Sequence, residues 1–385
     1  MLSGINVGLG VTGSVAAVEV VEIAHELRRR GATVKGVMTD SASNIVHPWT
    51  VEFATDQEVC TEITGATEHI ELFGTDGWAD VFLVAPATAN TIGKMAGAID
   101  DTPVTTSATT ALGAGIPIVV APAMHRPMYD HPGVLSAIDT LQEWDVTVVD
   151  PRFEEGKAKI ADVDTIVLDT ARAVGAQPLA GNTVIVTSGA TAEPIDPVRV
   201  LSNRASGKTG RAVARGLYAL GADVILVHDG PDVPYADVET VRTASDMREA
   251  VLSNLGSADA LVSAAAISDY TVEQAEEKIR SGQELTLHLE PTPKLLEAVR
   301  DRDPDLPIVG FKVETGPESS MIDRARDLQD RYGLAFVVAN DVSVMGEKET
   351  SVRFVDGESA DEFTGSKADL GLRVAEELAE RIVYR

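Results

Sequence analysis

Several residue types are scarce in this 385-residue chain, and each scarcity excludes a class of structure. Cys60 is the one cysteine, which excludes an intrachain disulfide and a site with several thiolate ligands, and a reducing compartment is expected. Aromatic residues make up 4% of the chain and hydrophobic residues 44%, which favours Ala- and Val-rich sheet and helix layers. Glu19, Glu22 and the arginines at 28–30 interrupt the first apolar stretch. We therefore expect no signal peptide, no membrane span and a cytoplasmic location.

Positive charge is scarce as well. The chain has 32 Lys and Arg residues against 60 Asp and Glu residues, a formal net charge of −28. Such a surface repels nucleic acid backbones and anionic lipids, so neither is an expected partner. Arginines outnumber lysines, and an acidic, lysine-poor surface is typical of proteins kept soluble in very high salt. We predict a halophilic, cytosolic protein whose stability rises with potassium chloride concentration.

Short β-branched segments alternate with helical patterns along the whole chain. In the first half, strands are expected at 5–9, 34–37, 81–85 and 116–121, with a helix at 15–30. In the second half, strands are expected at 183–187, 223–228, 260–264, 308–310 and 336–339, with helices at 211–220 and 366–381. Right-handed βαβ crossovers predict an α/β protein with a doubly wound parallel sheet in each half. Ligands of such sheets bind beyond the carboxyl ends of the strands.

The chain is too long for one ordinary core, so two domains are expected. Its composition turns to Gly, Ala, Gln and Pro near Gly175, and a new strand pattern starts at Thr183. This change predicts a first domain at 1–175, a linker at 176–182 and a second domain at 183–385.

Three small, polar segments follow strands of the first half. The Gly-rich segment 8–14 leads from a strand into a helix, the segment 85–91 follows the next buried strand, and the segment 121–128 brings Met124, His125 and Arg126 to the same sheet edge. Glycines, hydroxyls and helix-start amides of this kind can bind a phosphate. An ordinary tight turn is the alternative for the first segment taken alone.

Together with the segment 66–72, these segments resemble the flavin-binding cysteine decarboxylase family, in particular phosphopantothenoylcysteine decarboxylase. The resemblance covers about the first 170 positions and implies a flavodoxin-like domain, a catalytic base at His69 and a contact of His125 with the substrate carboxylate. It implies an FMN held by Gly10, Thr12, Gly13, Ser14, Thr39, Thr88, Asn90 and Met124. A flavin is needed because it oxidises the cysteine thiol to a thioaldehyde, which can accept the electrons that decarboxylation releases before the reduced flavin returns its own.

The first half departs from this family in one segment. Many members carry a cysteine in a flap that returns a proton to the product, whereas the segment 151–159 has no thiol. Lys157, Lys159 and Glu155 are the candidate proton donors, and Lys157 or Lys159 could instead bind the substrate phosphate.

The second half opens with its most informative segment, 187–210, which runs from a strand through a Pro-punctuated loop into a helix. Hydroxyls, glycines and Lys208 converge there, which favours phosphate binding, although the spacing is not that of the common NTPase phosphate loop.

The segments 194–199 and 202–210 resemble phosphopantothenate–cysteine ligase, and further signatures follow at 263–270, 277–280, 292–294, 310–315 and 338–343. The resemblance implies a Rossmann-like domain in which CTP and Mg²⁺ activate 4′-phosphopantothenate for attack by cysteine. Asn203 would hold the carbonyl region of the intermediate and Lys278 would stabilise developing charge. Asp269 would meet the nucleotide or its metal, and Phe311 would border the base. The remaining implied substrate contacts are Ser206, Gly207, Lys208, Ala265 and Lys294. ATP stays an alternative to CTP, because backbone groups can recognise a base.

Both halves together resemble the fused bifunctional enzyme of coenzyme A synthesis. The expected partners are 4′-phosphopantothenate, cysteine and CTP, and the resemblance implies homo-oligomers with flavin-domain trimers and ligase-domain dimers. Two alternatives stay open. The ligase could be fused to a flavin domain that acts on another thiol, or to one with a regulatory, non-enzymatic role.

Overall fold

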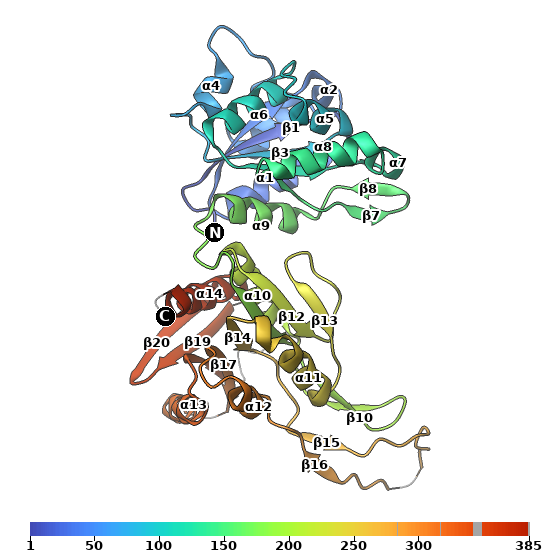
Figure 1. Ribbon diagram of the computed structural model, residues 1–385, viewed down its shortest axis with the longest axis vertical. Coiled ribbons are helices and arrows are strands. Elements are labelled where there is room, and N and C mark those ends of the chain that lie inside the picture. The colour runs from blue at the N-terminus through green and yellow to red at the C-terminus, as the bar shows by residue number, and fades with distance from the viewer. Residues whose placement is uncertain (283, 316, 342–348, 384–385) are drawn as a thin grey trace. The chain divides into compact units, whose positions relative to one another are not determined.

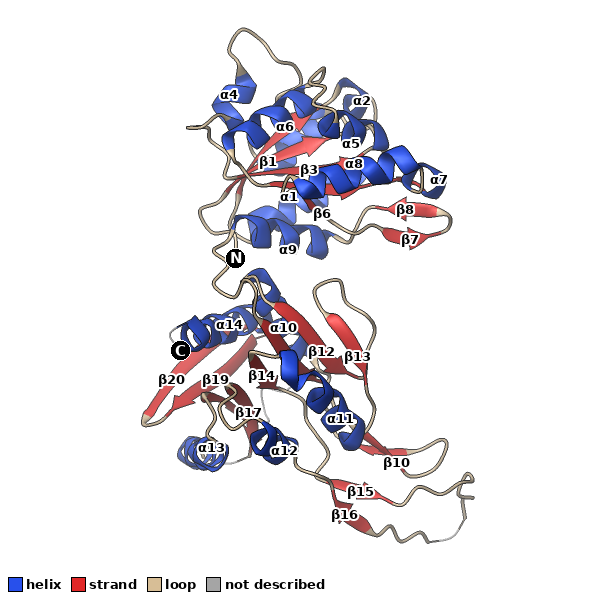
Figure 2. Cartoon of the chain, in the orientation of Figure 1, coloured by secondary structure: helices blue, strands red, loops and turns tan. Residues whose placement is uncertain are grey.

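The computed structural model describes residues 1–385 except 283, 316, 342–348 and 384–385. It divides into two compact units, Met1–Ala176 and Gln177–Arg385, each with its own sheet and helices (Figure 1). Figure 2 shows strands and helices alternating through both units, which confirms the predicted α/β class.

The first unit is built on a five-stranded parallel sheet. Its strands are β1 (Asn6–Val11), β2 (Thr33–Met38), β3 (Val81–Ala87), β4 (Ile118–Pro122) and β6 (Thr147–Val148). They lie in the order β2-β1-β3-β4-β6, all parallel. Counted along the chain this is the order 2-1-3-4-5 of flavodoxin-like sheets, so the predicted fold of this unit is confirmed.

Helices cover both faces of this sheet. They are η1 (Val15–Glu19), α1 (Val20–Arg29), α2 (Asp40–Ser43), α3 (Pro48–Thr55), α4 (Glu68–Phe73), α5 (Ala89–Ala96), α6 (Pro103–Ala114), α7 (Arg126–Tyr129), α8 (Pro132–Glu143) and α9 (Val163–Val174). Along β3, Val81 and Leu83 point to the core under α1 and α9, whereas Phe82 and Val84 point to the core under α5, α6 and α8. This alternation follows from the two-residue period of a strand.

Two local predictions in this unit were wrong. The predicted phosphate turn at 8–14 begins too early, because Gly8 and Gly10 lie inside β1. A Cβ on Gly8 would lie 2.3 Å from the ring of Phe73, and one on Gly10 would lie 2.8 Å from the ring of Phe82. These glycines therefore make room for two aromatic rings of the core. The predicted helix at 15–30 is divided, since Ala17 N bonds to Ser14 O in the i→i+3 pattern of the 3₁₀ segment η1.

A small antiparallel sheet is formed by segments that flank β6 in the chain. It consists of β5 (Met124–His125), β8 (Lys157–Lys159) and β7 (Arg152–Glu154), in that order. The thiol-free flap predicted at 151–159 is thus a hairpin, β7–β8, that pairs with the segment after β4.

The second unit is built on an eight-stranded sheet. Its strands are β9 (Thr183–Ser188), β12 (Asp223–His228), β13 (Asp237–Thr240), β14 (Ala260–Ser263), β17 (Ile308–Glu314), β18 (Phe336–Asp341), β19 (Glu349–Asp356) and β20 (Ser359–Ser366). The order is β13-β12-β9-β14-β17-β18-β19-β20. The six strands from β13 to β18 are parallel and have the order 3-2-1-4-5-6 of the dinucleotide-binding fold, which confirms the Rossmann-like prediction. The antiparallel strands β19 and β20 were not predicted.

Two helices of this unit, α10 (Lys208–Ala219) and α14 (Lys367–Val383), cross at very short distance. A Cβ on Gly371 of α14 would lie 2.1 Å from the carbonyl oxygen of Ala212, and one on Gly216 of α10 would lie 2.5 Å from the carbonyl oxygen of Gly371. The remaining helices are α11 (Ala244–Asn254), η2 (Leu255–Ser257), α12 (Leu295–Arg302) and α13 (Glu318–Tyr332). Apolar residues of α11, α12 and α13 share one core cluster with the sheet.

Two short ribbons leave the sheet of the second unit. One is the hairpin of β10 (Ala192–Pro194) and β11 (Val200–Ser202), and the other pairs β15 (Tyr270–Val272) with β16 (Leu289–Pro291). Figure 1 shows β10 beside β15 and β16, with the loop between β15 and β16 extending away from the sheet.

Candidate active sites

Loops that follow the strands of the first unit meet at the carboxyl edge of its sheet. The Thr12 hydroxyl donates to Pro86 O at 2.7 Å and accepts from Thr88 N at 3.1 Å. The Ser14 hydroxyl donates to Ala123 O at 3.3 Å, and Thr39 N donates to Val11 O at 3.1 Å. The loops after β1, β2, β3 and β4 therefore form one connected surface, at the place where this fold class binds ligands.

This surface offers the donors that a phosphate needs. Thr88 caps α5 by accepting from Thr91 N at 3.2 Å, which leaves the amides of Ala89 and Asn90 in the first turn of that helix. Such amides and the positive end of the helix dipole favour an anion. A Cβ on Gly13 would lie 2.5 Å from Ser41 Oγ, so only glycine lets these two loops approach so closely. The donor set and the close approach of the loops fit a phosphate-bearing cofactor such as FMN.

The predicted cofactor residues divide into two groups. Thr12, Gly13, Ser14, Thr39, Thr88, Asn90 and Met124 lie in or directly after the connected loops, whereas Gly10 lies in β1. His125 lies next to Met124 on β5 and is exposed.

The predicted base, His69, lies on α4, which packs against α6. Its Nδ1 is buried and has no hydrogen-bond partner among the described residues. Figure 1 shows α4 and the β7–β8 flap at opposite sides of the first unit. One chain therefore does not bring His69 together with the flap.

The candidate proton donors on the β7–β8 flap have different surroundings. Lys157 is exposed and lies opposite His125 in the β5–β8 pairing. Lys159 lies 3.0 Å from a carboxylate oxygen of Glu154 and 3.0 Å from one of Glu155. The hydrogen bond to Glu155 raises the pKa of Lys159, and the same contact lowers the pKa of Glu155.

The second unit contains a cavity of about 850 Å³ beyond the carboxyl ends of β9, β14 and β17. Among the residues that the structure describes, six basic side chains line it together with one carboxylate, Asp269. The basic residues are Arg204, Lys208, Lys294, Lys312, Arg331 and Lys367. In a chain of net charge −28, this concentration of positive charge marks a site for a strongly anionic ligand.

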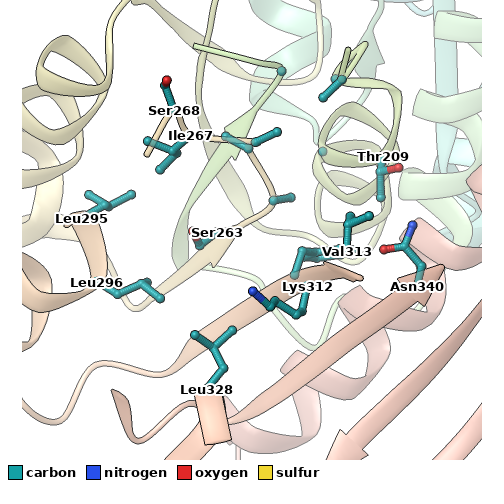
Figure 3. Close-up of a pocket in the computed structure, with 18 of the residues that line it drawn as sticks. Thr209, Ser263, Ile267, Ser268, Leu295, Leu296, Lys312, Val313, Leu328 and Asn340 are labelled. Atoms are coloured by element: carbon teal, nitrogen blue, oxygen red, sulfur yellow. The ribbon is translucent and has the colours of Figure 1, made fainter. Parts of the chain in front are cut away.

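The wall of the cavity is mixed in character. Figure 3 shows Leu295 and Leu296 on one side, Thr209 and Asn340 on the other, and Lys312 between them. Lys312 is also 3.1 Å from Glu314, which pairs with Arg324 as well. An apolar wall beside polar and charged groups suits a ligand with both a flat or aliphatic part and phosphates.

The entrance of α10 forms one end of this cavity. Gly207 caps the helix with a φ of 69°, and a Cβ there would lie 2.9 Å from Gly189 N. Only glycine meets both conditions, so the loops after β9 and before α10 touch at this point. The Ser188 hydroxyl donates to Gly207 O at 2.8 Å and fixes the contact.

Seven residues predicted for the ligase site line this cavity. They are Ser206, Gly207, Lys208, Ala265, Asp269, Lys294 and Phe311. Lys294 Nζ lies 2.6 Å from Asp269 Oδ1, although both side chains are largely exposed. In the described part of the chain, no group of three His, Cys, Asp or Glu residues is placed to hold a metal ion.

Two predicted residues do not line the cavity. Asn203 Nδ2 donates to Ala266 O at 2.9 Å, and Ala266 is a wall residue, so Asn203 lies next to the site. Lys278 is exposed on the loop between β15 and β16.

Sequence reasoning missed four of the six cavity cations. Arg204 and Lys312 stand inside the quoted ligase signatures and could have been found there. Arg331 at the end of α13 and Lys367 at the start of α14 lie far from every signature, and only the folded sheet brings them to the cavity. Arg199 was also not singled out, although the structure gives it several partners.

Among the described residues, we find no helix whose length and apolar content would suffice for crossing a membrane.

Comparison with known proteins gives matches to both units. A Flavoprotein family model matches residues 1–175, and the model of the DNA/pantothenate metabolism flavoprotein C-terminal domain matches residues 179–383. The coenzyme A biosynthesis bifunctional protein CoaBC of Thermococcus kodakarensis is 45% identical over 99% of this chain and 96% of its own length. The protein of the same name from Bacillus subtilis is 34% identical over 98% of both chains.

Solved structures match one half of the chain at a time. The DNA/pantothenate metabolism flavoprotein from Streptococcus pneumoniae is 22% identical, covering 52% of this chain and 99% of its own, with a TM-score of 0.47. The FMN-dependent cysteine decarboxylase SpaF is 30% identical, covering 44% of this chain and 99% of its own, with a TM-score of 0.39. The full-length sequence relatives decide the assignment: the chain belongs to the family of the coenzyme A biosynthesis bifunctional protein CoaBC.

Proposed function

We propose that the second unit joins 4′-phosphopantothenate to cysteine at the expense of CTP, and that the first unit decarboxylates the product with FMN to give 4′-phosphopantetheine. The observation that carries the ligase half is the cavity lined by six basic residues and one carboxylate in a chain of net charge −28. Family membership supports both halves.

The cavity chemistry suits carboxylate activation. The carboxylate of 4′-phosphopantothenate attacks the α-phosphorus of the triphosphate, and pyrophosphate leaves. The cysteine amine then attacks the acyl carbon, loses a proton and displaces the nucleoside monophosphate. Both substrates are polyanions, so Lys208 and Lys312 on the wall would offset charge that the rest of the surface repels.

Each predicted ligase residue has a role in this scheme. Asn203 would hold the carbonyl region, Lys278 would stabilise charge that develops on the phosphorus, and Phe311 would border the base. Asp269 would contribute one ligand to Mg²⁺, with phosphate oxygens and water as the others, which is the usual coordination of Mg²⁺ beside a triphosphate. Lys294 holds Asp269 at 2.6 Å and would compete with the metal or neutralise a phosphate.

The carboxyl edge of the first unit would hold the flavin. The first amides of α5 would bind its phosphate, while Thr12, Ser14 and Thr88 hold the surrounding loops in place through their bonds to Pro86 O, Ala123 O and Thr91 N. When bound, the flavin would supply a reversible two-electron oxidation of the cysteine thiol to a thioaldehyde, which makes the substrate itself able to accept the electrons that decarboxylation releases. His69 would take a proton from the substrate, and His125 would donate a hydrogen bond to its carboxylate.

Lys157 is the flap residue best suited to return a proton. It lies opposite His125 and is exposed, whereas Lys159 is held between two carboxylates that raise its pKa. The separation of His69 from the flap within one chain supports a homo-oligomer in which a neighbouring copy completes the flavin site. The family resemblance is the ground for proposing flavin-unit trimers and ligase-unit dimers. The single cysteine supports a cytoplasmic location.

The thiol-free flap also supports a second candidate, an active ligase fused to a flavin unit that acts on another thiol or only regulates. Incubation with 4′-phosphopantothenate, cysteine, Mg²⁺ and either CTP or ATP separates the two, with products identified by mass spectrometry. The proposed function expects 4′-phosphopantetheine together with pyrophosphate and carbon dioxide. Product that stops at the cysteine adduct would favour the second candidate and reject the decarboxylase half.

Two variants assign the residues. His69→Asn should abolish carbon dioxide release and leave the ligase reaction intact, with His25→Asn as the matched control, since His25 lies on α1 in an edge-to-face contact with the exposed ring of Phe53. Unchanged carbon dioxide release in His69→Asn would exclude this histidine as the base. Asn203→Asp should slow ligation without changing the flavin absorbance.

A further inference from the structure

Asp196 in the turn of the β10–β11 hairpin is a fully buried carboxylate surrounded by donors. Its Oδ1 accepts from Val198 N at 2.8 Å and from Arg199 N at 2.9 Å. Its Oδ2 accepts from Arg199 Nε at 2.9 Å, from Arg199 Nη2 and from Ile279 N at 3.1 Å. A buried carboxylate with this many donors is fixed in one orientation.

The same pair of residues binds both backbone groups of Ile279. Asp196 accepts from its N–H, and Arg199 Nη2 donates to its carbonyl oxygen at 2.6 Å. A third bond, from Ala275 N to Ile195 O at 3.0 Å, holds the same loop to the same turn. We call these contacts the Asp196 clamp. The clamp ties down a part of the chain that lies eighty residues away from the hairpin in sequence.

The clamped segment carries Lys278, which directly precedes Ile279. It belongs to the long loop between β15 and β16, and loops of this length usually have a function of their own. Lys278 itself is exposed. The clamp therefore fixes the backbone beside the lysine and leaves its side chain able to reach a ligand.

The hairpin also carries Asn203, at its other end. Asn203 directly follows β11, while the clamp lies in the turn that precedes this strand. The four residue steps from Arg199 to Asn203 span about 13 Å in an extended strand. About this length of chain separates Asn203 from the turn that binds the backbone beside Lys278.

The clamp is insensitive to pH in the working range. The Arg199 guanidinium holds the pKa of the Asp196 carboxyl far below its ordinary value, with the Val198, Ile279 and Arg199 amides adding to the effect against the cost of burial. The carboxylate therefore stays charged near neutral pH, and the contact with Arg199 and Ile279 is kept there.

We propose that Asp196 is a positioning residue of the ligase: through Arg199 and the backbone of Ile279 it sets where Lys278 stands relative to Asn203. This inference rests on the proposed function of the second unit. Asp196 acts only through the lysine, so its removal should matter only while the lysine is present.

A double-mutant cycle tests this coupling. The variants are Asp196→Asn, Lys278→Gln and the two combined, in the full-length protein, with ligation measured as the cysteine adduct formed at saturating 4′-phosphopantothenate, cysteine and CTP. Asp196→Asn is isosteric but gives up the charge that Arg199 requires. Glu276→Gln is the control, because it removes one negative charge from an exposed position of the same loop.

We expect kcat to fall about tenfold in Asp196→Asn, with a smaller change in the KM for CTP, and to stay near the wild-type value in Glu276→Gln. The double variant should be no slower than Lys278→Gln alone, since coupled residues give non-additive effects. Hydrogen exchange of the amides at 273–282 should be faster in Asp196→Asn, while circular dichroism reports an intact fold.

Three results would overturn the proposal: unchanged kcat in Asp196→Asn, a further tenfold fall when it is added to Lys278→Gln, or unchanged exchange at 273–282. A wild-type protein that forms no cysteine adduct would instead reject the proposed ligase function. In that case the exchange measurement still decides whether Asp196 fixes the loop.

Discussion

The crossing of α10 and α14 allows a stability prediction with a definite size. Gly371→Ala would place a Cβ 2.1 Å from the carbonyl oxygen of Ala212, whereas ordinary contact begins at 3.4 Å. The obstacle is backbone, so no rotamer change relieves it and the two helices must move apart. Alanine would otherwise stabilise a helix interior by about 1 kcal/mol relative to glycine. Overpacking of this kind costs about 1–3 kcal/mol, and parting the helices loses further contacts.

We therefore expect the second unit to lose about 2 kcal/mol of stability, which for a unit of this size lowers Tm by about 4–8 °C. The chain provides a selective assay, because Trp49, Trp78 and Trp144 all lie in the first unit. Tryptophan fluorescence follows the first unit, while far-ultraviolet circular dichroism follows both. Gly371→Ala should lower the midpoint temperature of the second unit's transition, which circular dichroism detects and tryptophan fluorescence does not.

Gly256→Ala is the matched control, because a Cβ at Gly256 meets nothing within 4 Å in the same unit. It should leave the transition unchanged or raise it. A Gly371→Ala protein that melts at or above the wild-type temperature would refute the close helix contact. A fall in the fluorescence transition of equal size would show that the two units do not unfold separately.

Three further predictions concern pH, nucleotide binding and salt. Burial holds the pKa of His228 below its ordinary value, so the unfolded chain binds a proton that the folded chain does not. The free energy of unfolding should therefore fall as the pH drops below about 6.5, and it should fall less steeply in His228→Gln. Urea midpoints at pH 7.5 and 5.5 measure both trends. Lys312→Met should raise the KM for the triphosphate about tenfold, or about 1.4 kcal/mol, without changing flavin absorbance; an unchanged KM would remove Lys312 from the anion site. Raising potassium chloride from low to molar concentration should raise both thermal transitions, because salt screens the repulsion within a chain of net charge −28; a flat response would reject the halophilic hypothesis.

Most of the fold could be predicted from the periodicity of the strand segments. Eight of the nine predicted strands begin and end within two residues of the observed bounds, because β-branched residues repeat in short segments bounded by turns. The ninth, β17, runs four residues further than predicted, and the short strands β6 and β13 were not predicted. The strands β19 and β20 were missed, since their mixed polar sequence packs on only one side. The glycines of β1 were assigned to a phosphate turn, because nothing in the sequence tells that Phe73 and Phe82 approach the strand there.

The candidate sites were predictable where a residue stands in a short signature. Lys208 and Phe311 are of this kind, and both line the cavity. Arg331 and Lys367 are not, since a helix end and a helix start become neighbours only through the order of the strands between them. The Asp196 clamp was also out of reach, because it joins two loops through backbone groups, which leave no trace in side-chain patterns.

The division of one chain at Ala176 into two complete units has a consequence for the cell. Every copy of the chain contains one anion-binding cavity in the second unit and one set of connected loops at the sheet edge of the first unit, so a change in gene expression cannot change the ratio between the two sites. If the reaction in the cavity of the second unit is faster than the reaction at the connected loops of the first unit, the intermediate accumulates and must be released, held or returned. The balance between the two steps is therefore set by the rate constants of the two units alone, and selection on pathway flux acts on both halves of a single gene.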